Sequence, residues 1–355
     1  MSNGPLLNAL NLILGEKRLK LLTWTSKDGL SLNDCWLNLA ELSRIPDIEK
    51  KKAQFDIDKE YTKLNINGIR LVTYSDLEYP SYLREIPFPP LGIYLKGLPL
   101  PKNFDFNLAI VGTRKLSNYG EIVIKKIIPS LVQNQINIIS GLALGVDAFA
   151  HKETLKCNGY TAAVLGSGLN CIAPLTNLSL ANQIAMHGTL ISELPLNTPP
   201  LAQHFPLRNR IISGLSRVVL VIEAPLKSGS LITAKYGLDQ NRDILAVPGS
   251  IFNINAEGTN NLIARGAKLV STVDDILDAF NIDNSPKIQQ SIIEELSQDE
   301  KVVLEVIRTN NSSHVDKIAS LAKLRPARVL SASTLLELKG LISSEGNGYF
   351  NANKV

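Results

Sequence analysis

Glycines, arginines and hydroxyl side chains gather in short turns that directly follow apolar runs. The clearest turn is Gly112-Thr113-Arg114, which follows the apolar run at residues 108–111 and precedes a helical pattern. Glycine lets a ligand approach the backbone, the start of a helix offers free N–H groups, and arginine can grip a phosphate through two hydrogen bonds. These residue types favour phosphate binding. The alternative is an ordinary tight turn that carries an exposed arginine.

A second constellation interleaves an aromatic ring with cations. Phe205 and Pro206 are followed by Arg208, Asn209 and Arg210. An aromatic ring beside arginines suits a stacked base flanked by phosphates, and base stacking contributes roughly 1–3 kcal/mol per base. A phenylalanine here is as compatible with the apolar core as with a stacking platform, so both interpretations stay open.

Three more turns of this kind follow other apolar runs: Ser140-Gly141, Gly166-Ser167-Gly168 and Ser228-Gly229-Ser230. The second begins like the dinucleotide pattern G-x-G-x-x-G, but Cys171 occupies the third glycine position, which weakens that interpretation. Asp147 and His151 lie one helical turn apart after the first of these turns. Their spacing favours a capping or orienting pair over acid/base partners.

Signatures of catalysis are weak. The sequence contains no G-x-x-x-x-G-K-[ST] loop and no H-E-x-x-H motif, and its histidines do not cluster with cysteines or carboxylates at metal-ligand spacing. Glu193 and Glu223, which end two apolar runs, are the carboxylates best placed for acid/base work. The residues therefore favour a nucleotide or nucleic-acid binder, without metal or cofactor, over an enzyme.

Bulk composition sets the remaining limits. The chain has 355 residues, which predicts two or three domains. Its net charge is only +4, so any nucleic-acid site must concentrate basic residues locally. Three widely separated cysteines argue against a disulfide framework or zinc ribbon and fit a reducing compartment. There is no signal-peptide pattern and no apolar run of about 18 residues, so we expect a soluble, cytoplasmic protein without a membrane segment.

The elements that must position these turns alternate between strands and helices. Near-continuous apolar runs rich in β-branched residues are typical of strands that are buried on both faces. The predicted strands are 69–73, 91–95, 108–111, 136–139, 161–165, 189–191, 218–222, 244–247 and 267–270. The predicted helices between them are 119–133, 147–157, 178–187, 207–215, 231–241 and 260–265. Such alternation predicts an α/β fold with an extended Rossmann-like, mostly parallel sheet, whose ligand lies at the carboxyl ends of the strands.

Smaller units are expected on either side of this sheet. Residues 1–67 predict a small helical (SAM-like) domain, residues 68–280 the Rossmann-like domain and residues 281–290 a polar linker. A proline-rich stretch at residues 80–90 indicates an extended connection. Residues 291–355 predict helices at 299–308, 315–321 and 327–339 and a hairpin that turns at 345–348, which suggests a winged helix. Lys323, Arg325 and Arg328 give its third helix some charge, and a DNA-reading or protein-docking role both stay open.

Several motifs resemble those of the DNA processing protein A family, also called DprA or Smf. The resemblance covers roughly residues 68–280, and the motifs keep the family's order and spacing. They are IVGTRKLSNYG (110–120), ISGLALGVDAFAHKETL (139–155), AAVLGSGLN (162–170), ISELPLNTPPLAQHFPLRNRIISGLSRVVLVIEA (191–224), KSGSLITA (227–234), AVPGSIF (246–252) and EGTNNLIARGAKLV (257–270).

The resemblance implies a protein that binds single-stranded DNA, protects incoming strands in natural transformation and helps to load the RecA recombinase. Such proteins act as homodimers and without catalysis, and by resemblance the helix near residues 260–265 is a candidate dimer face. The implied DNA pocket combines the G-[ST]-R loop, the glycine loop after residue 165, the F-P-x-R-N-R segment and the turn after residue 227. In this chain the corresponding residues are Gly112, Thr113, Arg114, Gly166, Gly168, Phe205, Arg208, Asn209, Arg210, Ser228 and Gly229.

Two positions depart from the family pattern. Ala173 replaces the tyrosine of a Tyr-Pro pair, and Ala202 and Gln203 stand where members often carry a basic residue. These departures remove one aromatic contact and shift phosphate binding onto Arg114 and Arg208.

Two rival hypotheses have their own expected features. A Rossmann-like phosphoribohydrolase, which cleaves nucleoside phosphates, would need P-G-G-x-G-T-x-x-E, but here Pro248-Gly249 continues with Ser250-Ile251. A DNA site confined to residues 291–350 would be lost when that unit is removed.

Overall fold

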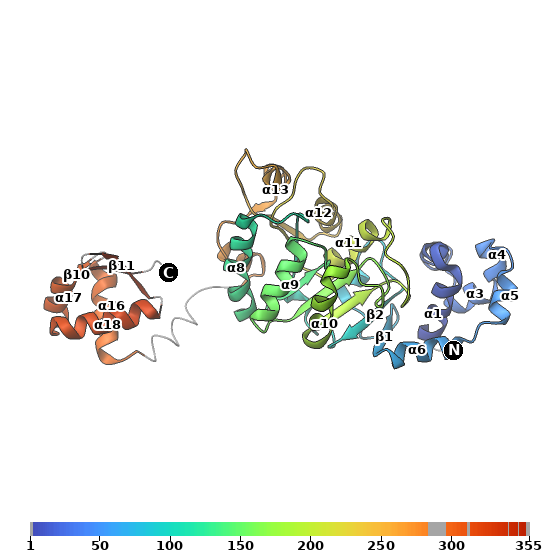
Figure 1. Ribbon diagram of the computed structural model, residues 1–355, viewed down its shortest axis with the longest axis horizontal. Coiled ribbons are helices and arrows are strands. Elements are labelled where there is room, and N and C mark those ends of the chain that lie inside the picture. Colours follow the sequence, from blue (N-terminus) through green and yellow to red (C-terminus); the bar gives the residue numbers. More distant parts are fainter. Residues whose placement is uncertain (1–2, 283–295, 311–312, 340, 347, 353–355) are drawn as a thin grey trace. The chain divides into compact units, whose positions relative to one another are not determined.

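The computed structural model describes residues 3–282, 296–310, 313–339, 341–346 and 348–352 (Figure 1). The chain divides into two compact units, residues 1–282 and residues 283–355. Each unit has its own apolar core. The boundary expected between residues 67 and 68 stays a prediction. Residues 283–290 of the expected linker lie outside the described residues, so the linker also stays a prediction.

A single large sheet organises the first unit. Among the described residues it has nine strands in the order β1-β2-β6-β5-β4-β3-β7-β8-β9. The pairs β1–β2 and β2–β6 are antiparallel, and every other neighbouring pair is parallel, which confirms the mostly parallel sheet. The strands are β1 (Ile69–Thr73), β2 (Gly92–Gly97), β3 (Asn107–Val111), β4 (Asn137–Ser140), β5 (Thr161–Leu165), β6 (Thr189–Ser192), β7 (Val218–Val221), β8 (Asp243–Ala246) and β9 (Lys268–Leu269).

Helices follow the strands along the chain, as the alternation predicted. Helix α8 (Asn118–Gln133) is typical of them. Ser117 caps its start by accepting a hydrogen bond from the Gly120 N–H, and its buried stripe is formed by Ile124, Ile128 and Leu131. The helices are α8 (Asn118–Gln133), α9 (Val146–Lys156), α10 (Leu178–His187), α11 (His204–Gly214), α12 (Ser230–Asp239), α13 (Ile254–Ala264) and α14 (Asp274–Ala279).

Alternating side chains of the central strands enter two different cores. On β3, Leu108 and Ile110 pack with residues of α8, α9 and α14. The intervening Ala109 and Val111 pack with residues of α11 and α12 on the other face. A strand that is covered on both faces needs apolar side chains at every position, which explains the near-continuous runs in the sequence.

The strand order contains one topological switch point, between β3 and β7. From β3 the chain moves through β4 and β5 to β6 on one side, and β7 and β8 then follow on the other side of β3. Loops that leave the carboxyl ends of β3 and β7 therefore diverge to opposite sides and leave a crevice between them. Ligands of open α/β sheets bind in such a crevice.

Four features of the first unit differ from the expectations drawn from the sequence. Helix α13 begins at Ile254 and not at residue 260, because the Asn253 side chain caps its start by accepting from the Asn255 N–H. Helix α11 begins at His204 and not at residue 207, since proline is tolerated in the first turn and Pro206 does not delay the helix. The proline-rich connection is not wholly extended, because α7 (Ser81–Arg84) forms one helical turn directly after Pro80. Helix α14 was not predicted, and Ile276 and Leu277 bury it against the sheet.

The N-terminal helices share their core with one side of the sheet. Leu7 and Leu10 pack in the same cluster as Leu71 of β1, Tyr94 of β2 and Leu180 of α10. This part is helical, as expected, with α1 (Asn3–Leu14), α2 (Lys20–Ser26), α3 (Leu32–Leu37), α4 (Leu39–Ser43), α5 (Ile48–Ala53) and α6 (Ile57–Ile66).

The second unit contains the three helices and the hairpin that the sequence predicted. Its described elements are α16 (Gln298–Asn310), β10 (Ser313–His314), α17 (Val315–Ala322), α18 (Pro326–Leu338), β11 (Ile342–Gly346) and β12 (Tyr349–Ala352), with strand order β10-β12-β11. The short strand β10 was not predicted. Residue 347, in the predicted hairpin turn, lies outside the described residues.

Candidate nucleic-acid interface

A pocket of about 660 Å³ lies across the carboxyl ends of the central strands. Its walls come from the loops after β3, β4 and β7 and from the first turns of α11 and α12. The loop at residues 173–174 closes one side. Of the residues predicted from the sequence, the pocket is lined by Gly112, Thr113, Arg114, Gly141, Phe205, Arg208, Asn209, Ser228 and Gly229.

The loop after β3 is held tightly in place. The Thr113 N–H donates to the Glu223 carbonyl oxygen at 2.7 Å, and the Thr113 carbonyl accepts from the Val146 N–H at 3.1 Å. Gly145 has φ +77°, and a Cβ added to it would lie 2.3 Å from the Thr113 carbonyl oxygen. Only glycine fits this position, and its presence fixes the path of residues 112–114.

Positive charge reaches the pocket from three sources. Arg114 and Lys227 are exposed lining residues, and neither forms an ion pair with any residue that the structure describes. The N-terminus of α12 also faces the pocket through Ser228, Gly229 and Ser230, and a helix N-terminus carries a partial positive charge. An anionic ligand is the chemistry that this wall favours.

Arg208 lies under the pocket and is only 6% exposed. Its Nη1 donates to the Gly141 carbonyl oxygen at 2.7 Å and also to the Val164 carbonyl oxygen. Burial lowers the pKa of Arg208 to about 10, against the opposing effect of Asp147, so the side chain stays charged at neutral pH. Arg208 thus joins the ends of β4 and β5 across the pocket floor.

Asp147 is the one acid among the described residues that line the pocket. Its Oδ2 accepts from the N–H groups of Gly141 at 3.1 Å and Ala143 at 3.4 Å, so it organises the loop after β4. Burial raises the pKa of Asp147. His151 hydrogen-bonds to the Thr161 hydroxyl at 2.6 Å, and burial lowers its pKa to about 3. The expected pairing of Asp147 with His151 is therefore replaced by separate partners.

Phe205 is half-buried and lies between the pocket and the glycine loop after β5. A Cβ added to Gly166 would meet the Phe205 ring at 2.8 Å, so glycine lets the ring pack directly on the backbone. Gly168 packs against the carbonyl groups of Pro195 and Leu196 instead, and its N–H donates to Thr198. This loop supports the aromatic ring but does not itself line the pocket.

Four predicted residues besides Gly166 lie outside the pocket lining: Ser140, Ser167, Gly168 and Arg210. The hydroxyl of Ser140 donates to the Ile110 carbonyl oxygen, and that of Ser167 donates to the Cys171 carbonyl oxygen, both at 2.6 Å. Arg210 is buried in an ion pair with Glu193 at 2.6 Å. The Ser140 contact joins β4 to β3, the Ser167 contact closes its own loop, and the Arg210 contact joins α11 to the loop after β6.

The two carboxylates singled out for acid/base work have structural partners. Glu193 is held by Arg210, as just described. Glu223 accepts from the Ser117 N–H at 3.0 Å and the Ser117 hydroxyl at 2.5 Å, so it supports the start of α8. Neither lines the pocket.

Sequence reasoning missed Lys227 and Leu144 as lining residues. Lys227 had a signal, since it begins the turn after a buried strand, at the same sheet edge as Arg114. No comparable signal marks Leu144, whose exposure follows from the tight turn between Leu142, at φ +56°, and Gly145.

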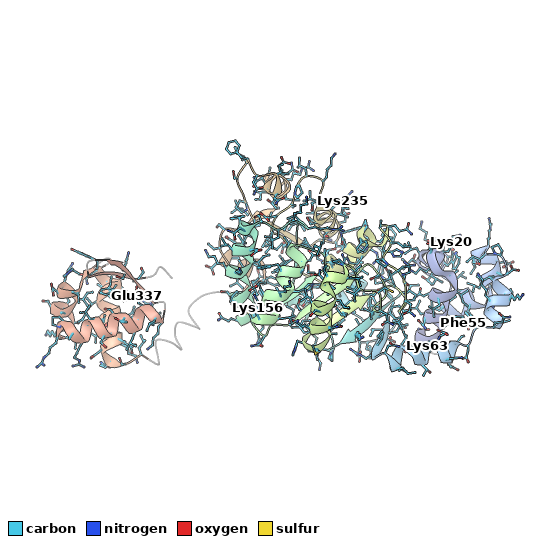
Figure 2. All side chains as sticks on the ribbon, in the orientation of Figure 1. Lys20, Phe55, Lys63, Lys156, Lys235 and Glu337 are labelled. Atoms are coloured by element: carbon cyan, nitrogen blue, oxygen red, sulfur yellow. The ribbon has the colours of Figure 1, made fainter. Side chains whose placement is uncertain are left out.

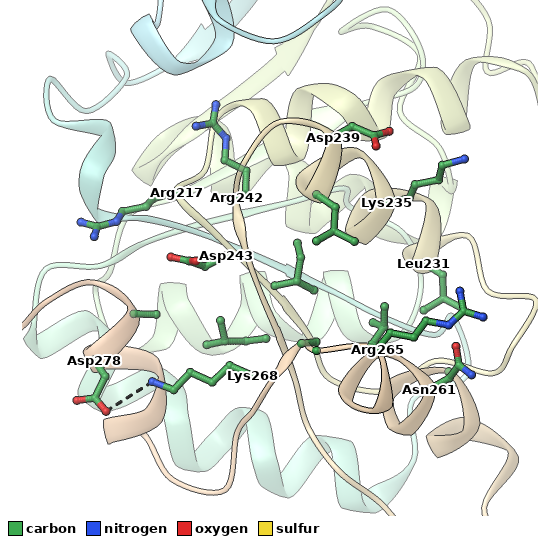
Figure 3. Close-up of a pocket in the computed structure, with 18 of the residues that line it drawn as sticks. Arg217, Leu231, Lys235, Asp239, Arg242, Asp243, Asn261, Arg265, Lys268 and Asp278 are labelled. Carbon is green, nitrogen blue, oxygen red and sulfur yellow. Dashed lines mark ion pairs between the residues drawn. The ribbon is translucent and has the colours of Figure 1, made fainter.

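A second, larger groove of about 930 Å³ lies along the β8–β9 edge of the sheet (Figure 3). Its walls are α12 and α13, and its rim mixes five basic with three acidic side chains. Lys268 pairs with Asp278 at 3.5 Å. None of the residues predicted to bind DNA lines this groove.

Metal-binding clusters and membrane-spanning helices are both absent from the part of the chain that the structure describes. No group of three or more His, Cys, Asp and Glu residues is arranged to hold a metal ion there. No helix in that part of the chain is long and apolar enough to span a membrane.

Comparisons with known proteins agree on one family. The sequence model of the family described as DNA recombination-mediator protein A matches residues 70–281. Protein Smf of Escherichia coli strain K12 is 35% identical over 97% of this chain and 93% of its own length. DNA processing protein DprA of Bacillus subtilis strain 168 is 37% identical over 72% of this chain and 87% of its own length.

Two solved structures resemble this one. The X-ray structure of DNA processing protein A from Streptococcus pneumoniae has a TM-score of 0.62 and 34% identity, over 76% of this chain and 92% of that one. DNA processing protein A from Helicobacter pylori, described for its unique single-stranded DNA binding mode, has a TM-score of 0.53 and 27% identity. It covers 60% of this chain and 97% of its own.

Proposed function

This chain belongs to the DNA recombination-mediator protein A family, and we propose that it binds single-stranded DNA in the pocket across the carboxyl ends of β3, β4 and β7. The observation that carries the proposal is the placement of exposed Arg114 and Lys227 and the α12 N-terminus around the half-buried ring of Phe205. Cationic groups and an aromatic platform in one pocket suit a strand whose phosphates and bases are both accessible. The Helicobacter pylori relative, described as binding single-stranded DNA, supports the same ligand.

We assign two kinds of role to the predicted residues. Arg114, Lys227, Thr113, Ser228 and Gly229 would contact phosphates, and Phe205 would stack against a base. Arg208, Arg210 and the glycine loop after β5 would position these groups, because Nη1 of Arg208 donates to strand-end carbonyl oxygens, Nη2 of Arg210 is paired with Glu193, and the glycine loop packs against protein. Asn209 would link the two sets, since its side chain donates to the Gly229 carbonyl oxygen at 3.2 Å.

The proposed role in the cell is that of a recombination mediator. By family resemblance, the protein would protect incoming single strands in natural transformation and help to load the RecA recombinase, without catalysis. This role places it in the cytoplasm, where the recombinase and chromosomal DNA are found. Two observations disfavour the rival phosphoribohydrolase hypothesis. The sequence lacks the motif of that family, and the carboxylates of Glu223 and Glu193 are engaged by Ser117 and Arg210, respectively.

For assembly, we propose a homodimer that uses the face formed by α13 and β9. Strand β9 ends the sheet, is only two residues long and is exposed, so its edge is open to a partner. The adjoining groove carries both charge signs, with Lys235 on α12 (Figure 2) and Arg265 facing it alongside Asp239 (Figure 3). A two-fold interface requires such self-complementarity. Leu269→Asp should reduce the mass in solution from dimer to monomer, and an unchanged mass would exclude this face.

We propose that the second unit is a winged helix that docks protein more than DNA. Arg328, on the helix α18, is engaged by Asp299 through two hydrogen bonds of 2.7 and 2.8 Å. The outward residues of α18 include three exposed leucines, Leu330, Leu335 and Leu338. An apolar outer face suits a protein partner better than a phosphate backbone.

The experiment that tests the proposed function compares the full chain with residues 1–282 for binding to oligo-dT and to duplex DNA. We expect both proteins to bind the single strand more tightly than the duplex. Loss of all single-strand binding in the shorter protein would move the site to the second unit. Release of a free base from nucleoside monophosphates by the purified protein would support the enzyme instead.

A further inference from the structure

An exposed apolar turn precedes α13 and has no role in the pocket. Residues 250–253 form a tight turn in which the Asn253 N–H donates to the Ser250 carbonyl oxygen at 2.9 Å. Ile251 is 81% exposed and Phe252 is 91% exposed, and Ile254 follows at 67%. Three large apolar side chains that are exposed together, two on this turn and one at the start of α13, indicate a contact surface.

The turn is fixed to the same loops that build the pocket. The Asn255 side chain donates to the Lys115 carbonyl oxygen at 3.3 Å, and the backbone carbonyl oxygen of Asn255 accepts from the Ala224 N–H at 2.7 Å. The Tyr119 hydroxyl donates to the Pro248 carbonyl oxygen at 2.8 Å. Phe252 is therefore presented by a rigid support, and a preformed contact surface loses little entropy on binding.

The position of the turn along the sheet edge identifies its occupant. The pocket spans the carboxyl ends of β4, β3 and β7, and β8 is the next strand in the sheet, about 4.8 Å further on. The turn follows the carboxyl end of β8. A polymer that crosses the strand ends and leaves the pocket past β7 meets this turn next.

The neighbouring charges also favour nucleic acid over an apolar protein segment. Lys115 follows Arg114 directly, and Lys227 lies in the loop after β7; both lysines are exposed. Glu257 is exposed in the first turn of α13, so phosphates should pass on the Lys115 side. Cations that accompany an exposed aromatic ring are the combination that binds single strands, where each base has a face to stack.

We propose that Phe252 is a second base-stacking position, which takes an unpaired base of the same strand after it leaves the pocket. This inference rests on the proposed function. It extends the track for DNA from the switch point between β3 and β7 to the carboxyl end of β8. Phe252 would act through its ring alone, since its backbone N–H is directed to the Ser250 hydroxyl at 3.3 Å.

The test measures binding of two oligo-dT probes, of about 6 and about 20 nucleotides, to the full chain and its variants. Phe252→Ala should weaken binding of the longer probe by about 5-fold or more and leave the shorter probe and the salt dependence unchanged. Phe252→Trp should restore the affinity. Phe88→Ala is the matched control, because Phe88 is also an exposed phenylalanine and lines neither the pocket nor the groove along β8 and β9.

A second readout uses the fluorescence of Phe252→Trp, which a stacked base should quench. The parent protein corrects for Trp24 and Trp36, which lie in the N-terminal helices. If the parent binds both probes and Phe252→Ala matches it on the longer one, this inference is overturned while the proposed function stands. An equal loss on both probes also overturns it. If the parent binds neither probe, the proposed function fails, and the inference fails with it.

Discussion

The guanidinium of Arg208 donates a 2.7 Å hydrogen bond to the carbonyl oxygen of Gly141, on the loop that follows β4. The same guanidinium nitrogen also donates to the Val164 carbonyl oxygen, on β5. A single buried cation thus joins two strand ends below the pocket. By contrast, Arg114 lies on the rim and is exposed. Two arginines of the predicted site consequently have different physical roles.

Replacing Arg208 should therefore affect folding first. Arg208→Ala leaves buried carbonyl oxygens without a charged donor, which should lower the free energy of unfolding by roughly 3 kcal/mol or more. Arg114→Ala is the matched control and should change stability by less than about 0.5 kcal/mol. Denaturant unfolding of the two variants measures both effects. Equal stability of Arg208→Ala and the parent would contradict the positioning role.

Gly145 should be intolerant of a side chain. Its φ of +77° is unfavourable for other residues, and a new Cβ would lie 2.3 Å from the Thr113 carbonyl oxygen. Gly145→Ala should cost roughly 1–3 kcal/mol and displace the loop that carries Arg114, so that DNA binding weakens as well. Gly229→Ala provides the control for stability, since no atom lies within 4 Å of its added Cβ. Thermal unfolding and oligonucleotide binding of both variants test this contrast.

The ring of Phe205 should contribute to affinity without contributing to the salt dependence. Phe205→Leu keeps an apolar side chain over Gly166 but removes the ring that could stack on a base. We expect binding to oligo-dT to weaken by roughly 1–3 kcal/mol with an unchanged salt slope. Fluorescence anisotropy across a salt series measures both quantities. If Phe205→Leu binds oligo-dT as tightly as the parent, the ring has only a structural role in the core.

Stability should fall in mild acid because of His151. Burial, with a smaller contribution from the charge of Arg208, lowers the pKa of His151 from 6.5 to about 3. The unfolded chain therefore takes up a proton, as the pH falls below 6.5, that the folded chain does not. The free energy of unfolding is therefore unaffected by His151 above pH 6.5. Between pH 6.5 and pH 3 it falls by up to about 1.4 kcal/mol for each pH unit.

His151→Gln should remove this part of the pH dependence. Its unfolding free energy should vary less between pH 7 and pH 5 than that of the parent, by up to roughly 2 kcal/mol. His187→Gln is the control, because His187 is exposed at the end of α10. Parallel pH profiles for the parent and His151→Gln would contradict the assignment.

The sheet could be predicted from the sequence because its strands are buried on both faces. β1 and β5 have the predicted bounds, and the other strands differ from them by one or two residues at an end. A short, continuous apolar run rich in β-branched residues favours a buried strand over a helix or a loop, so its assignment was reliable. Arg114 lines the pocket at the strand end where the sequence predicted a ligand, and its role in binding stays a prediction.

The direction of the side chains on α11 could not be predicted. The pattern Arg208-Asn209-Arg210 looks like one cationic cluster, but a helix that begins at His204 turns each residue by about 100° from the last. Arg208 consequently meets strand carbonyls, Asn209 lines the pocket and Arg210 meets Glu193. The buried partner of each arginine comes from a strand end that lies far away in the sequence, so it could not be predicted from the local pattern.

The most direct test of the central claim is the salt dependence of oligo-dT binding to the parent and to Arg114→Ala, with duplex DNA as the comparison. Neutralising one phosphate on a single strand contributes about −0.7 to the log–log slope. We predict tighter binding to the single strand than to the duplex, and for Arg114→Ala weaker binding with a slope that is shallower by about 0.7. Identical affinity and slope for the two proteins would contradict a DNA site at the carboxyl edge of β3, β4 and β7.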